Sequence, residues 1–121
     1  MHKILFVGLN PTKLSIPRKG GAWHRFCQWL DQMSLQQMVS FTNLSPDPYW
    51  DGKEIDTEFF LKSIEGYDRI VVWGPQVSDR LKKIGVDHFV LPHPSPLNRQ
   101  INNADYISQC LENCKKYLNG V

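Results

Sequence analysis

The sequence predicts an α/β fold: a three-layer α/β/α sandwich built on a central four-stranded parallel sheet. Short, almost wholly apolar runs alternate with longer segments whose apolar residues recur at helical spacing. Strands that are apolar on both faces are typical of parallel sheets covered by helices on each side. Because parallel neighbours are joined by right-handed crossovers, the pattern predicts one compact domain over residues 1–121.

Four segments have the composition of buried strands, rich in β-branched, aromatic and aliphatic residues. These are "KILFVGL" (3–9), "MVSFTNL" (38–44), "RIVVWG" (69–74) and "HFVL" (88–91).

Four further segments place their apolar residues on one helical face. Pro75 suits a first helical turn, and Gly66 and Gly85 suit helix ends. The predicted helices are "AWHRFCQWLDQM" (22–33), "DTEFFLKSIEGY" (56–67), "PQVSDRLKKIG" (75–85) and "NADYISQCLENCKKYL" (103–118).

The composition is that of a soluble globular protein, with 41% apolar and 21% charged residues and a net charge of +2. No apolar run reaches the length of about 18 residues that a membrane span needs, and the N-terminus lacks a signal-peptide cleavage pattern. We therefore expect an intracellular protein, in the cytoplasm or, for a viral chain, in the host cytoplasm or nucleus. Three cysteines without a secretion signal argue against a disulfide framework, and Cys110 and Cys114 are interpreted as helix-face thiols rather than metal ligands.

Charge is distributed unevenly along the chain. Residues 1–25 hold five basic residues and no acidic one, whereas residues 47–58 hold five acids against Lys53 alone. Such asymmetry can position a polyanion on one side of a molecule, or it can be an ordinary solvated surface. Charge alone leaves both interpretations open.

The segments that leave the four predicted strands converge in space, because ligands of parallel α/β sheets bind outside the carboxyl ends of the strands. All four are rich in Pro, Asn, Gly or Ser: "GLNPT" (8–12), "NLSPDP" (43–48), "WGPQ" (73–76) and "PHPSPLN" (92–98).

Three side chains in these segments are candidates for chemistry. Asn10 is held towards an extended conformation by Pro11, so its amide can hold a water molecule or a ligand edge. His93 stands between two prolines and can donate a hydrogen bond to developing negative charge. Asn43 ends the second strand with a donor and an acceptor together, as reading a base edge requires. Each can also be a simple turn residue. No phosphate-binding glycine motif follows the first strand.

In this order the motifs resemble those of the uracil-DNA glycosylase superfamily over about residues 3–118. "HPSPL" (93–97) is similar to the second conserved motif of the classical branch. "GLNPT" and "GAWHRFCQWL" resemble the first motif, and the helix after it, of the mismatch-specific and thymine-DNA glycosylase branch. The resemblance implies hydrolysis of the N-glycosidic bond of uracil, or of a closely related 5-substituted pyrimidine, leaving an abasic site, with no metal or organic cofactor.

The resemblance also implies roles for individual residues. Asn10 would position the attacking water, His93 would hydrogen-bond O2 of the departing pyrimidine, and Asn43 would read the edge of the base. The nucleotide must be flipped out of the duplex, and Leu97 would be the apolar wedge that enters the vacated space. Contacts to the DNA backbone would come from a further set of residues: Ser95, Arg99, Lys13, Arg18 and Lys19.

Four features bear on the match to the family pattern. Asn10 is neutral where the classical branch has an aspartate, so slower chemistry is expected. Thr12 stands where one branch has tyrosine and the other glycine, which leaves the choice of base open. Trp23 is a candidate for stacking on the base, with a core role as the alternative. The three cysteines do not match the four that hold an iron–sulfur cluster in some members.

We thus expect a monomeric DNA glycosylase whose partner is DNA carrying uracil or a modified pyrimidine, with no membrane partner. Two alternatives stay open: a catalytically weak member that acts as a DNA-binding or partner-binding module, and a hydrolase of free modified nucleosides or nucleotides.

Overall fold

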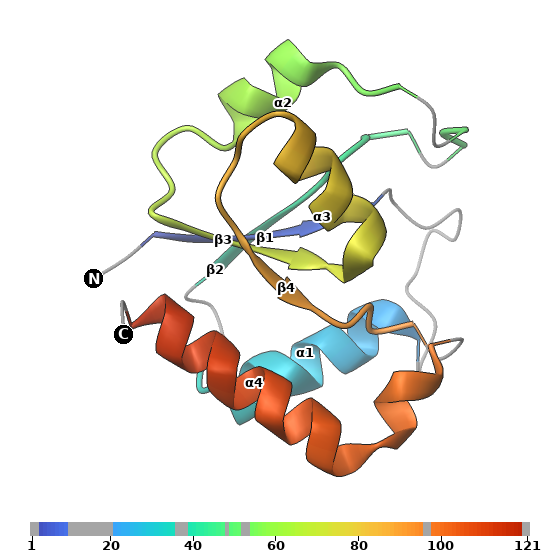
Figure 1. Cartoon of the computed structure of the whole chain (residues 1–121), viewed down its shortest axis with the longest axis vertical. Coiled ribbons are helices and arrows are strands. Elements are labelled where there is room, and N and C mark those ends of the chain that lie inside the picture. The colour runs from blue at the N-terminus through green and yellow to red at the C-terminus, as the bar shows by residue number, and fades with distance from the viewer. Residues whose placement is uncertain are drawn as a thin grey trace.

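The computed structural model describes residues 3–9, 21–35, 39–47, 49–51, 54–95 and 98–119. Strands and helices alternate along these segments (Figure 1). Their bounds are β1 (Ile4–Gly8), α1 (Ala22–Gln32), β2 (Val39–Asn43), α2 (Thr57–Ser63), β3 (Arg69–Trp73), α3 (Gly74–Lys83), β4 (Phe89–Leu91), the 3-10 helix η1 (Arg99–Asn102) and α4 (Ala104–Leu118).

The four strands form one parallel sheet in the order β2-β1-β3-β4, so the prediction of an α/β fold with a four-stranded parallel sheet is confirmed. Every residue of β1 is buried, as its apolar composition predicts. In register, Gly8 lies beside Asn43, Val7 beside Val72, and Trp73 beside Leu91. All four strands therefore end at the same edge of the sheet.

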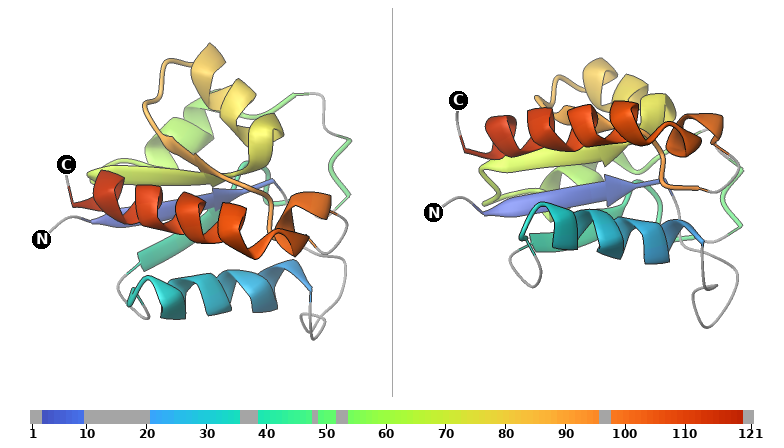
Figure 2. Two further views of the ribbon diagram at one scale, coloured as in Figure 1. Left: turned by 60° about the horizontal axis from the view of Figure 1, so that its bottom comes forward. Right: turned by 90° about the horizontal axis from the view of Figure 1, so that it is seen from below.

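Alternate residues of each central strand point to opposite faces. Phe6 and Val71 pack with the buried residues of α1 and α4 on one face. Leu5 and Val72 pack with those of α2 and α3 on the other face. Figures 1 and 2 show the same division, with α1 and α4 on one side of the sheet and α2 and α3 on the other.

Two predicted helices begin at side chains that cap them. Asp56 accepts a hydrogen bond from the Phe59 amide at 3.0 Å, and Asn103 accepts one from the Tyr106 amide at 3.0 Å. Such caps satisfy N–H groups that have no partner inside the helix. The predicted helix 56–67 ends earlier, at Ser63, and a turn with Gly66 at a φ of +85° connects it to β3.

None of the helices among the described residues is both long enough and apolar enough to cross a membrane.

Candidate functional site

His93 lies at the end of β3 rather than out beyond β4, the edge strand to which it is attached. A Cβ added to Gly74 would come within 3.3 Å of the His93 Cβ. Gly74 also has a φ of +80°, a conformation that side chains disfavour. Glycine at this position thus avoids strain in the backbone turn into α3 and also a tight contact with the histidine packed on it.

The hydrogen bonding of His93 identifies which ring nitrogen carries the proton. The backbone N–H of Ser95 donates to Nδ1 at 3.0 Å, so Nδ1 is an acceptor and holds no proton. Burial lowers the pKa of His93 below its ordinary value, which keeps the ring neutral at pH 7. The neutral imidazole therefore carries its proton on Nε2, and Nε2–H is a donor that can stabilise developing negative charge.

Ser95 belongs to the site through its backbone, which orients the ring. The same loop is closed by Asn98, which the sequence prediction missed. The Asn98 Nδ2 donates to the carbonyl of His93 at 3.0 Å, and its Oδ1 accepts from the Gln100 amide at 3.1 Å. Asparagine just before a helix is a common cap, and this was the signal available in the sequence.

Asn98→Ala is expected to lower the free energy of unfolding by about 1–3 kcal/mol, since it removes two hydrogen bonds worth about 0.5–1.5 kcal/mol each. Urea denaturation measures this change. Asn102→Ala, at an exposed position of η1, is the matched control and should change stability by less than about 0.5 kcal/mol. Equal effects of the two variants would contradict the role assigned to Asn98.

Asn43 lies at the carboxyl end of β2, on the same sheet face as α1 and beside Gly8. A Cβ on Gly8 would stand 2.9 Å from the Asn43 Oδ1, 2.9 Å from the Phe41 Cζ and 3.1 Å from the Trp73 Cε3. These three side chains therefore converge over Gly8, in space that only glycine leaves open. Asn43 itself is half-buried, with its amide at the edge where the strands end.

Gly8→Ala is expected to destabilise the fold by about 1–3 kcal/mol, because three packed side chains must move to admit one methyl group. Thermal or urea denaturation measures the loss. Gly85→Ala provides the contrast: its added Cβ meets nothing within 4 Å, and only its φ of +74° opposes the side chain. A Gly8→Ala protein as stable as the wild type would show that the packing over Gly8 is loose.

A chain of aromatic contacts connects Trp23 to the histidine. Trp23 packs edge-on against Phe41 at 5.0 Å between ring centroids, Phe41 packs against Trp73 at 4.8 Å, and Trp73 meets the His93 ring at 5.7 Å. Trp23 is 41% exposed while its ring packs against Phe26 and Phe41, so both the stacking role and the core role stay predictions. It lies at the outer end of this series, and Phe41 and Trp73 are the rings nearer the site.

Trp73 was not singled out from the sequence. Its side chain is only 6% exposed, and within the described part of the chain its indole N–H has no hydrogen-bond partner. A buried donor without a partner costs free energy, and such groups call for an explanation. Its neighbours Gly8 and His93 both belong to the site.

Asn43 lies at the end of β2, beside Gly8 of β1, and His93 lies beside Gly74, directly after β3. Neighbouring strands lie about 4.8 Å apart, so about 10 Å separates the backbone at Asn43, on β2, from the end of β3, where His93 lies. The Trp73 ring lies between them, with its Cε3 beside the Asn43 Oδ1 over Gly8 and its centroid 5.7 Å from that of the His93 ring. Asn43 supplies an amide at one end and His93 a neutral N–H donor at the other.

Of the remaining predicted residues, Arg99 is the one that lies among the described residues. Arg99 is exposed at the start of η1, immediately after the loop that carries His93. The other predicted positions fall outside the described residues: Asn10, Thr12, Lys13, Arg18, Lys19 and Leu97.

His88 differs from His93 in both place and bonding. It precedes β4 at the opposite edge of the sheet, where its Nδ1 donates to the Val86 carbonyl at 2.8 Å. Its Nε2 therefore accepts from the Ser78 hydroxyl, at 2.7 Å. Ser78 is buried, so this pair holds α3 to the start of β4 and is structural.

The free energy of unfolding is expected to fall as the pH drops below about 6.5, the ordinary pKa of histidine. There the unfolded chain binds a proton at residue 93 while burial keeps the native ring neutral, so stability rises with pH across this window. This loss of unfolding free energy is complete once the pH is below the lowered pKa of His93 in the folded protein. Urea titrations of the wild type and of His93→Gln, which cannot titrate, should differ in slope there; parallel slopes would contradict this account.

Within the segments that the structure describes, no group of three His, Cys, Asp or Glu side chains is arranged to hold a metal ion. All three cysteines of the chain are free thiols. Comparisons with models of protein families, with curated protein sequences and with solved structures found no match.

Proposed function

We propose that this protein is a DNA glycosylase of the uracil-DNA glycosylase type. It would hydrolyse the N-glycosidic bond of uracil, or of a closely related 5-substituted pyrimidine, in a flipped nucleotide. The observation that carries the proposal is the state of His93: a neutral imidazole, oriented by the Ser95 amide, whose Nε2–H is left as a donor. The parallel sheet in the order β2-β1-β3-β4 and the resemblance of "GLNPT" and "HPSPL" to the family motifs also support it.

The chemistry requires a donor of this kind. When the bond between C1′ of deoxyribose and N1 of the base breaks, its electron pair goes to the base and spreads onto O2. A neutral N–H donor stabilises that charge without first protonating the base. Water then bonds to C1′ and loses a proton, which completes hydrolysis and leaves an abasic site.

The base would be recognised by Asn43, at the end of β2. Asn43 offers one donor and one acceptor, which together match the O4 and N3–H of uracil. By the resemblance, Asn10 would position the water, Thr12 would border the 5-position of the base, and Leu97 would enter the space that the base vacates. Ser95 and Arg99, with Lys13, Arg18 and Lys19, would contact the backbone.

The test is alkali-labile strand breakage of a labelled oligonucleotide that carries one uracil, offered as a single strand and as a duplex. A parallel panel of modified pyrimidines identifies the base. We expect cleavage of at least one uracil substrate. Absence of cleavage with every substrate, from protein shown to be folded, would contradict the proposal.

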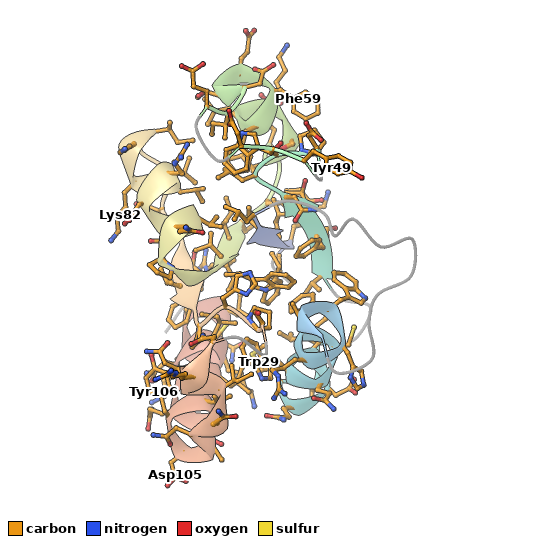
Figure 3. The ribbon with its side chains drawn as sticks, turned by 90° about the vertical axis from the view of Figure 1, so that its right-hand side faces the viewer. Trp29, Tyr49, Phe59, Lys82, Asp105 and Tyr106 are labelled. Carbon is orange, nitrogen blue, oxygen red and sulfur yellow. The ribbon has the colours of Figure 1, made fainter. Side chains whose placement is uncertain are left out.

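A second candidate is a catalytically weak family member that binds DNA or a partner protein. It is favoured by two large exposed side chains, Tyr49 at 72% and Phe59 at 59% exposed, both of which Figure 3 shows at the outer surface. The acidic segment 47–58 contains Tyr49 and ends next to Phe59. Salt-dependent DNA binding that His93→Ala leaves unchanged, without base release, would support this candidate over the first.

A further inference from the structure

A cleft runs along α3 on the face of the sheet opposite to His93. It consists of two adjoining hollows with cavity volumes of about 360 and 240 Å³. Arg80 and Lys83 line both hollows. The other lining residues are Glu54, Ile55, Thr57 and Ile84 in the larger hollow and Leu9, Trp50, Gln76 and Asp79 in the smaller one.

The polar wall of the cleft is one face of α3. Gln76, Arg80 and Lys83 are four and three residues apart, so they follow one another along the same side of the helix. Arg80 and Lys83 lie towards the C-terminal end of α3, and Gln76 lies in its first turn.

The opposite wall presents an aromatic ring in a fixed position. The indole N–H of Trp50 donates to the Glu54 carbonyl at 2.6 Å, so a ligand base would stack on the ring face that Arg80 does not cover. The guanidinium of Arg80 lies 5.5 Å from the centre of this ring, within the range of a cation–π contact. Cation and ring are thus held together on the cleft.

The cleft meets the candidate site at the edge of the sheet. Leu9 directly follows β1, and Gln76 lies two residues after Gly74, the residue that touches His93. Between β1 and β3 the chain turns to opposite sides of the sheet, because β1 leads to β2 and β3 leads to β4. Such a reversal is where ligands of open parallel sheets bind.

The side chains that line the cleft indicate which ligand it would bind. Arg80 and Lys83 suit a phosphate, and Trp50 suits the face of a base. Glu54 and Asp79 offset the positive charge of Arg80 and Lys83, so the cleft does not favour a ligand that is anionic over its whole surface. Their carboxylates also provide acceptors for base N–H groups. Paired bases in a duplex do not expose their faces, whereas the bases of a single strand do.

We propose that this cleft binds a nucleotide of single-stranded DNA that neighbours the target nucleotide. The inference rests on the proposed function, whose substrate it specifies as a strand with at least one unpaired flanking base. Trp50 lines the smaller hollow, of about 240 Å³, and Arg80 and Lys83 are shared with the larger one, so a base and its phosphate would occupy adjoining parts of the cleft.

The experiment measures binding of fluorescein-labelled oligothymidylate, which contains no uracil, by fluorescence anisotropy. Arg80→Gln with Lys83→Gln removes both cations of the cleft. Lys82→Gln with Lys116→Gln removes two exposed cations elsewhere, and Figure 3 shows Lys82 pointing away from the side of the molecule where Tyr49 lies. The two double variants have the same net charge, so a difference between them reports the cleft.

We expect the cleft variant to bind the single strand at least about tenfold more weakly than the wild type, and the control variant to remain within about twofold. Trp50→Leu should weaken binding by about 5- to 150-fold, the loss of one base–aromatic stack. Thermal denaturation of each variant establishes that it is folded.

The outcomes separate this inference from the proposed function. Equal affinities of the two double variants, or tighter binding of duplex than of single strand, overturn the inference even when uracil is released. Binding that depends on the cleft, without base release from any uracil substrate, upholds the inference and refutes the proposed activity. No binding of oligothymidylate by the wild type overturns the inference directly.

Discussion

His93→Ala is expected to lower the rate of base release by about 10²- to 10³-fold, the usual effect of removing one preorganised donor to a developing anion. The loss should appear in the rate of the chemical step, because in the proposed reaction the negative charge that Nε2–H would stabilise develops as the glycosidic bond breaks. Single-turnover measurements with excess enzyme isolate that step.

His93→Gln separates the hydrogen bond from the shape of the ring. Its amide supplies an N–H donor, so it should retain more activity than alanine does. His24→Ala changes an exposed histidine on α1 and should leave the rate within about twofold of the wild type. A His93→Ala protein as active as the wild type would exclude the histidine from the chemistry.

Phe60→Ala is expected to lower the free energy of unfolding by about 3–5 kcal/mol, the usual cost of a cavity left by a buried phenylalanine. Phe60 is 1% exposed and packs between α2 and the sheet, among the residues that include Leu5 and Val72. This is a large part of the 5–15 kcal/mol by which domains of this size are usually stable.

The adjacent residue supplies a matched control. Phe59 lies on the same helix but is 59% exposed, and Figure 3 shows its ring at the surface. Phe59→Ala should therefore change stability by less than about 0.5 kcal/mol. Both variants delete the same atoms from α2, so urea denaturation of the pair isolates burial; similar losses would contradict the packing described.

The sheet could be predicted because its signal is local. "KILFVGL" and "RIVVWG" are apolar throughout, and such runs are stable only when helices cover both faces. The end of α2 could not be predicted in the same way, because Ile64 and Tyr67 continue the apolar spacing past the last helical residue, Ser63. They still pack against the core, from a turn.

The candidate site was predictable where a residue carries its own signal. His93 between two prolines and Asn43 at a strand end both stand out in the sequence. The residues that give them their geometry do not, because Gly74 and Trp73 acquire their roles through contacts with a segment about twenty residues away. The roles proposed for Asn10, Thr12 and Leu97 stay predictions.

The close contact between Gly74 and His93 has a consequence for mechanical coupling within the domain. Gly74 is the first residue of α3, and no side chain cushions it from the histidine. A displacement of α3 would therefore change the packing of its first residue against the histidine. A ligand that binds Arg80 or Lys83 and displaces this helix would thereby change the position of His93.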